Sequence, residues 1–153
     1  MLDLEEELAH LIAALHEHNV QYALCGGLAL AVHGHPRATV DIDLLVREDG
    51  LADAKRVAAL LGFTVAARPM TFHAGAVSIH RVTKIDVTDG EILMLDLLLV
   101  TAQTEHAWSS RETHEWRGRP IAVVSREGLI ALKRLRSSAQ DAVDIAVLTE
   151  ATK

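Results

Sequence analysis

The chain has little of what membrane-spanning, disulfide-linked or repeat proteins are built from. It holds a single cysteine, Cys25, among its 153 residues, so no intramolecular disulfide can form and a reducing compartment is expected. The longest apolar stretch, near residues 92–100, is too short to span a bilayer and carries Asp96. No repeats or low-complexity segments occur, and the acidic N-terminus lacks the basic residues of a signal peptide. We therefore expect a cytoplasmic protein without membrane attachment, folded as one domain over residues 1–153.

Positive charge is scarce overall and unevenly placed. The net charge of −6 argues against a dedicated nucleic-acid coat or a polybasic membrane binder. Residues 1–20 hold five acids and no Lys or Arg, whereas residues 111–136 hold seven basic residues and three acids. The C-terminal part is therefore the one suited to meeting phosphate groups.

Helical and strand patterns are mixed along the chain, which predicts an α/β or α+β domain with a central mixed sheet flanked by helices. Helices are expected at 3–18, 28–33, 51–61, from Ser125 onward, and at 141–149, and strands at 20–25, 40–46, 63–66, 76–87, 91–100 and 121–124. The dipeptide Asp89-Gly90 predicts a tight turn that joins two of these strands as a hairpin. The polar segment 103–118 matches no regular element.

Two aspartates, Asp41 and Asp43, interrupt an otherwise buried-looking strand, Val40–Val46. Residues two apart on a strand point to the same face, so the two carboxylates project together, about 7 Å apart along the strand. Burying two like charges costs several kcal/mol unless something compensates them. A divalent cation is the natural compensation, and an edge strand with both side chains in water is the alternative.

Two further features belong to the same interpretation. Asp96 lies in the apolar run Leu93–Val100, where a neighbouring strand could place it against the first two acids, while Asp86 and Asp89 fit turn and surface positions. A glycine pair, Gly26-Gly27, separates a predicted strand from a predicted helix. Such a pair exposes backbone N–H groups to a phosphate, or else serves only as a turn that needs flexible dihedrals.

The order of these residues resembles that of the nucleotidyltransferase superfamily typified by DNA polymerase beta. The pattern is a glycine pair, thirteen residues, Asp41-Ile42-Asp43, and the later Asp96. The segment Arg37–Asp43 is similar to the Arg-x-Thr-x-Asp-Ile-Asp signature of small bacterial members, which include toxin–antitoxin, abortive-infection and lincosamide nucleotidyltransferases. Small members also carry a C-terminal Lys followed by two Asp, and here Lys133, Asp141 and Asp144 follow in that order. Ser138 stands where an Arg is expected, with Arg136 nearby.

The resemblance implies a single minimal nucleotidyltransferase domain with two Mg²⁺ ions held by the catalytic residues Asp41, Asp43 and Asp96. It implies transfer of a nucleoside monophosphate from a nucleoside triphosphate (NTP) such as ATP to a hydroxyl of a tRNA, a protein or a small molecule, with release of pyrophosphate. The nucleotide-binding residues are expected to be Gly26, Gly27, Arg37, Thr39 and Lys133. Asp141 and Asp144 are expected to cap a helix or form ion pairs.

Partners and alternatives remain open at this point. The short chain suggests a homo-oligomer or a toxin–antitoxin partner, because it leaves little material for an acceptor site. A catalytically inactive partner module of the same fold, such as an antitoxin-like binding protein, is the alternative. The nine histidines, among them His33 and His35, show no zinc-type spacing and are interpreted as scattered polar surface.

Overall fold

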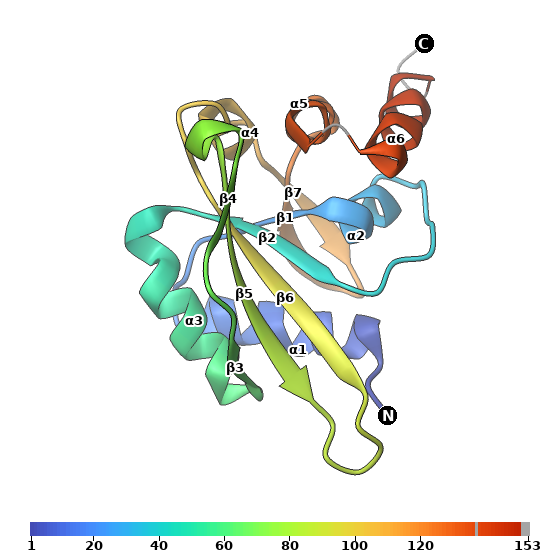
Figure 1. Cartoon of the computed structure of the whole chain (residues 1–153). Coiled ribbons are helices and arrows are strands. Elements are labelled where there is room, and N and C mark those ends of the chain that lie inside the picture. The colour runs from blue at the N-terminus through green and yellow to red at the C-terminus, as the bar shows by residue number, and fades with distance from the viewer. Residues whose placement is uncertain (137, 151–153) are drawn as a thin grey trace.

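The computed structural model describes residues 1–136 and 138–150. Within them, eight strands form one sheet and six α-helices surround it (Figure 1). The strands are β1 (Ala23–Cys25), β2 (Ile42–Val46), β3 (Phe63–Ala66), β4 (Met70–Phe72), β5 (Val77–Ile85), β6 (Ile92–Leu99), β7 (Glu112–Trp116) and β8 (Arg119–Val123). The helices are α1 (Leu4–Glu17), α2 (Gly26–Val32), α3 (Leu51–Leu60), α4 (Glu105–Ser109), α5 (Arg126–Arg136) and α6 (Ala139–Glu150), with short 3₁₀ turns η1 (Glu48–Gly50) and η2 (His73–Gly75).

The sheet is mixed, as the sequence predicted. Its strand order is β3-β5-β6-β2-β1-β8-β7, and β4 pairs with β5 beside this path. The pairs β2–β6 and β1–β8 are parallel, whereas the other pairs are antiparallel. This order places β2 and β6, which lie far apart in the sequence, next to each other in the middle of the sheet.

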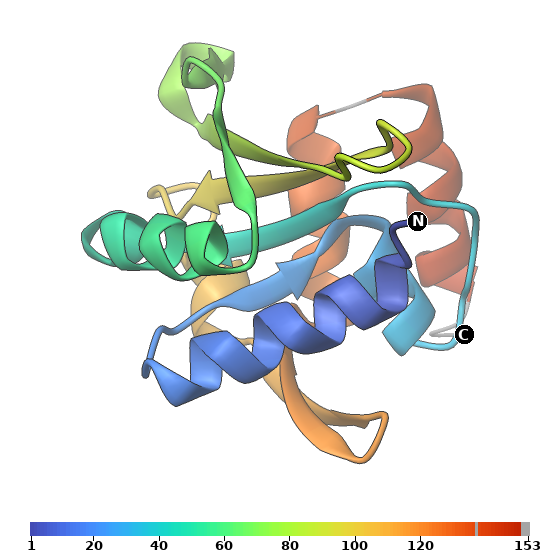
Figure 2. The same cartoon turned by 90° about the horizontal axis from the view of Figure 1, so that it is seen from below.

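Helices cover both faces of the sheet. Figure 1 shows α1 and α3 below the sheet and α4, α5 and α6 above it, and Figure 2 shows α1 lying across the lower face. α1 begins where the Asp3 side chain accepts a hydrogen bond from the Glu6 N–H, as a capping residue does. Its apolar stripe is fully buried against the sheet, and it comprises Leu8, Leu11, Ile12 and Leu15.

The boundaries differ from the expected ones at positions that matter for function. β2 begins at Ile42, so Asp41 lies one residue before the strand rather than on it. α2 begins at Gly26, so the glycine pair forms the first turn of the helix instead of preceding it. The unassigned segment 103–118 holds α4 and β7, and β4 was missed because three residues are too few to show a period-two pattern. None of the described helices is long and apolar enough to cross a membrane.

Candidate active site

Asp43 and Asp96 lie opposite each other on two neighbouring strands. β2 and β6 are parallel, and their register pairs Asp43 with Asp96. Adjacent strands are about 4.8 Å apart, and paired residues project to the same face of the sheet. Asp96 is only 5% exposed. Burial, followed by the nearby charge of Asp96, raises the pKa of Asp43 to about 7.

Asp41 belongs to the same electrostatic neighbourhood. Burial raises the pKa of its carboxyl, and the charge of Asp96 raises it further. Among the described residues, its Oδ1 atom is buried and has no hydrogen-bond partner. A buried carboxylate oxygen without a donor is costly, so this position favours a cation. The structure thus brings together the three acids that the sequence singled out.

Arg81 is the cation that this group already contains. It lies on β5, directly across from Asp96 on β6. Its Nε and Nη2 atoms donate to the two oxygens of Asp96 at 2.7 and 2.9 Å, a bidentate ion pair. One guanidinium balances one of the three carboxylates, so the group keeps an excess of negative charge.

The glycine pair is packed closely against residues of the predicted site. Gly26 has a φ of +69°, and a Cβ atom there would lie 2.2 Å from Oδ2 of Asp43. A Cβ atom on Gly27 would lie 2.9 Å from the Thr39 side chain and 3.3 Å from Cζ of Arg37. Only glycine therefore lets the start of α2 approach the Asp43 carboxylate and the segment that carries Arg37 and Thr39.

A cavity lies between Gly26, Asp43 and helix α5. Gly26 and Asp43 line it on one side, and Lys133 and Arg136 of α5 line it on the other. The remaining wall is largely apolar and includes Leu45, Leu98, Leu129 and Leu132. Of the three predicted acids, Asp43 thus shares this cavity with Lys133 and Arg136 of the predicted basic segment.

Lys133 is buried, at 4% exposed, and does not extend into water as a surface lysine would. Its ammonium group donates to Oδ2 of Asp144 at 2.9 Å. Arg37 reaches the same carboxylate with Nε at 3.1 Å and Nη2 at 3.0 Å. Burial alone would raise the pKa of Asp144, but the hydrogen bonds from Lys133, Gln140 and Arg37 outweigh it and lower the pKa.

Asp141 forms a second, adjoining ion pair. Arg136 donates to both of its oxygens, at 3.1 and 3.2 Å, and Ser138 donates to Oδ2 from its backbone N–H and its hydroxyl. These bonds lower the pKa of Asp141 despite its burial. The ion pairs predicted for Asp141 and Asp144 are thus confirmed. Arg136 makes the bidentate contact to Asp141, and Ser138 bonds the same carboxylate.

One protein family accounts for nearly the whole chain. The sequence profile of the family described as nucleotidyl transferase AbiEii toxin, type IV toxin–antitoxin system, matches residues 8–152. The chain belongs to the AbiEii family of nucleotidyltransferases. A search of curated protein sequences found no match.

Solved structures with the fold of this AbiEii-family chain are also nucleotidyltransferases. The antibiotic-resistance factor ANT(2'')-Ia aligns with a TM-score of 0.64 at 16% identity, covering 97% of this chain and 83% of its own. The lincosamide antibiotic adenylyltransferase LnuA aligns with a TM-score of 0.61 at 14% identity, covering 95% and 96%. A Thermotoga maritima protein described as a nucleotidyltransferase aligns with a TM-score of 0.57 at 18% identity, covering 99% and 91%. At these identities the likeness concerns the fold.

Sequence reasoning identified most of the polar groups gathered here in the AbiEii-family chain. The three acids converge, and Gly26, Gly27, Arg37, Thr39 and Lys133 all lie close to them or to the network at Asp144. It missed Arg81. This charged residue lies in the middle of a predicted strand, next to the strand that carries Asp96, and its position could have indicated a partner. Such a residue is expected to have a partner when one face of the strand is buried.

Proposed function

We propose that this chain transfers a nucleoside monophosphate from an NTP to a hydroxyl acceptor, using Mg²⁺ held by Asp41, Asp43 and Asp96. The observation that carries the proposal is the excess of buried negative charge at paired strand positions, together with the unpartnered Oδ1 of Asp41. Carboxylate oxygens are the ligands that Mg²⁺ prefers, so the donor set fits this ion. When bound, a pair of Mg²⁺ ions stabilises the attacking and leaving oxygens of an in-line displacement.

In the proposed reaction, the acceptor oxygen attacks the α-phosphorus. A new P–O bond forms there, the bond to the bridging oxygen of the β-phosphate breaks, and pyrophosphate leaves. We assign the acceptor's proton to Asp96. Each of its oxygens accepts one hydrogen bond from Arg81 and keeps a second lone pair, so the ion pair still leaves room for a proton.

We assign the triphosphate to the backbone at Gly26 and Gly27, with Arg37, Thr39 and Lys133 as its side-chain contacts. Support comes from the cavity shared by Gly26, Asp43 and Lys133 and from the packing of Thr39 and Arg37 on Gly27. Arg37 and Lys133 both donate to Asp144, which keeps their two charges close together. Asp144 balances one of the two charges, so the group would present a net charge of +1 toward a phosphate chain.

We extend the toxin–antitoxin context of the family to this chain, as a single minimal domain whose activity a partner antitoxin counteracts. A second copy of the chain, or the bulk of the acceptor, would complete the acceptor site. Expression of the wild type in bacteria without an antitoxin is expected to stop growth, whereas expression of Asp43→Asn at the same level is not. Growth arrest by both variants would refute the link between toxicity and this site.

The decisive experiment uses purified protein, Mg²⁺, cell extract and each NTP carrying the label on its α-phosphate. We expect one NTP to label a tRNA, protein or small-molecule fraction while pyrophosphate is released. Asp43→Asn is expected to abolish labelling, and Asp53→Asn serves as the matched control because that side chain is 55% exposed on α3. Wild-type turnover in Asp43→Asn would refute the mechanism. Absence of Mg²⁺-dependent nucleotide binding, measured by calorimetry, would instead favour a partner module without catalysis.

A further inference from the structure

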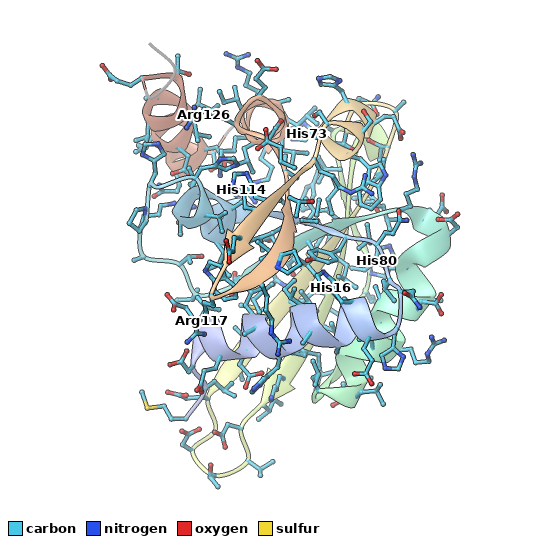
Figure 3. All side chains as sticks on the ribbon, turned by 180° about the vertical axis from the view of Figure 1, so that it is seen from behind. His16, His73, His80, His114, Arg117 and Arg126 are labelled. Atoms are coloured by element: carbon cyan, nitrogen blue, oxygen red, sulfur yellow. The ribbon has the colours of Figure 1, made fainter. Side chains whose placement is uncertain are left out.

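His33, Glu112 and His114 converge at the edge of the sheet, although the spacing of the histidines in the sequence was interpreted as scattered polar surface. Glu112 and His114 are two residues apart on β7, so they project to the same face, and His33 follows α2 as its C-cap. One ligand atom from each lies within 4.8 Å of the other two. Figure 3 shows His114 on the β7–β8 hairpin. These three residues, which we call the His33 cluster, do not line the cavity that contains Asp43.

The hydrogen bond made by His33 prepares its ring to bind a metal ion. Its Nε2 lies 2.9 Å from the carbonyl oxygen of Val124. A carbonyl oxygen only accepts, so Nε2 carries the proton and the lone pair of the neutral ring lies on Nδ1. Histidines that bind metal ions are commonly held in this way, with one N–H fixed by a backbone carbonyl and the other nitrogen free for the metal.

The spacing within the His33 cluster also approaches that of a coordination shell. Nε2 of His114 donates a hydrogen bond to Oε1 of Glu112 at 2.9 Å, and a metal ion bound between them would replace that proton. Two ligand atoms on a tetrahedral ion, each bonded at 2.0–2.1 Å, are about 3.3 Å apart. The rings of His33 and His114 are 5.1 Å apart, centroid to centroid, and are inclined at 77°. Small rotations of these half-exposed side chains would bring the three atoms to bonding distance.

We propose that His33, Glu112 and His114 form a binding site for a divalent transition-metal ion of the zinc type. Imidazole nitrogen selects ions such as Zn²⁺ over Mg²⁺, which prefers oxygen. The cluster therefore differs in its ion preference from the three acids of the proposed active site. Two imidazoles and one carboxylate make a three-ligand set that leaves a fourth position for water.

An ion at the His33 cluster would join two elements that meet at the edge of the sheet. His33 caps the end of α2, the helix whose first turn is Gly26-Gly27, whereas Glu112 and His114 belong to the edge strand β7. The ion would fix the position of α2 against this strand. Because it binds the folded chain, it would also raise the melting temperature as its concentration rises above the dissociation constant.

The test is a titration of the full chain, freed of metal by a chelator, with Zn²⁺ in competition with a chromophoric chelator. Apart from weaker binding at the three acids, we expect one tightly bound ion in the wild type. Its affinity is expected to be lower by at least about 10- to 100-fold in His114→Ala and in Glu112→Gln, because loss of even a supporting partner has that effect. His106→Ala, which removes an exposed histidine of α4, and Asp43→Asn are the matched controls and are expected to bind like the wild type. Wild-type affinity in His114→Ala, or loss of binding in Asp43→Asn alone, would overturn the proposal.

A second measurement uses the unmodified protein and does not depend on the folding of a variant. In the unmodified protein, Zn²⁺ is expected to shift the NMR ring signals of two of the nine histidines by a saturable one-ion process, while the signals of the other seven stay in place. Shifts spread over many histidines, or no saturable shift, would refute a built site. Circular dichroism of His114→Ala and Glu112→Gln, compared with the wild type, separates lost ligands from lost structure.

Discussion

Replacing Asp43 with asparagine is expected to stabilise the metal-free protein while destroying its proposed activity. The pKa of Asp43 lies at about 7, against 3.8 for an ordinary aspartate. Each pKa unit corresponds to about 1.4 kcal/mol, so the ionised carboxylate costs the fold about 4 kcal/mol at pH 8. An amide of the same shape carries no charge and avoids this cost.

The stabilisation by Asp43→Asn is expected to depend on pH. Below pH 4 the carboxyl is protonated in both the folded and the unfolded chain, so it adds no difference in stability. Between pH 4 and pH 7 the unfolded chain loses its proton while the folded chain keeps it, so the free energy of unfolding of the wild type falls as the pH rises. Above pH 7 the difference is constant. The advantage of Asp43→Asn should therefore grow from pH 4 to pH 7 and then level off.

Urea unfolding of both proteins at pH 5, 6, 7 and 8, with a chelator present, measures this difference. We expect the free energy of unfolding of Asp43→Asn to exceed that of the wild type by about 4 kcal/mol at pH 8 and by less at pH 5. Asp53→Asn, an exposed control on α3, should stay within about 0.5 kcal/mol of the wild type throughout. Saturating Mg²⁺ should stabilise the wild type and leave Asp43→Asn unchanged. An advantage that does not vary with pH would refute the assignment of a buried, destabilising charge to Asp43.

Three further outcomes follow from the same geometry. The affinity for Mg²⁺ should fall about tenfold for each pH unit below 7, because Mg²⁺ binding must displace the proton of Asp43. Calorimetry at pH 6 and pH 8 tests this, and an affinity that does not change with pH would contradict it. Gly26→Ala should abolish Mg²⁺-dependent ATP binding, because the added methyl group would displace the Asp43 carboxylate. Gly118 is the control, since its φ of +76° is similar but the space around it is open; Gly118→Ala should lose only about 1–2 kcal/mol of stability. Lys133→Met should lower the free energy of unfolding, measured by urea unfolding, by about 3 kcal/mol, because the buried Asp144 loses one of its hydrogen-bond donors. An unchanged free energy would contradict this and would mean that Arg37 alone satisfies Asp144.

The fold could be predicted largely from local patterns. The stripe of Leu8, Leu11, Ile12 and Leu15 has the period of a helix, and the apolar run around Asp96 has the length of a buried strand. The short elements β4, α4 and β7 could not be predicted in this way. α4 is shorter than two helical turns, β4 has three residues, and β7 (Glu112–Trp116) holds a single apolar residue, so none of them shows a hydrophobic period.

The sequence predicted the three acids of the site but not Arg81, which pairs with Asp96. The reason is the length of the loop between β5 and β6. A two-residue turn at Asp89-Gly90 would have placed Thr83 opposite Asp96. The loop is wider: the Asp86 N–H bonds the Glu91 carbonyl oxygen at 2.8 Å, and the last strand pair is Ile85 with Ile92. The side chain of Asp86 holds this wider loop by accepting a hydrogen bond from the Thr88 N–H.

This width shifts the strand register by two residues, and Arg81 becomes the partner of Asp96. The wider loop, in which Asp86 accepts a hydrogen bond from Thr88, goes together with the register that places Arg81 opposite Asp96. A dipeptide rule that considers only Asp89 and Gly90 contains no information about that bond.

Arg37 and Lys133 both bind Asp144, which lies near the C-terminal end of the described residues. The proposed site can therefore assemble only after this part of the polypeptide has been synthesised. Chains emerge from the ribosome N-terminal end first. Asp43 is synthesised before its neighbour Asp96, and the two basic groups meet their shared carboxylate only after α6 has been synthesised. A nascent polypeptide that lacks α6 therefore has no complete set of these residues, so the proposed chemistry can begin only after α6 has been synthesised.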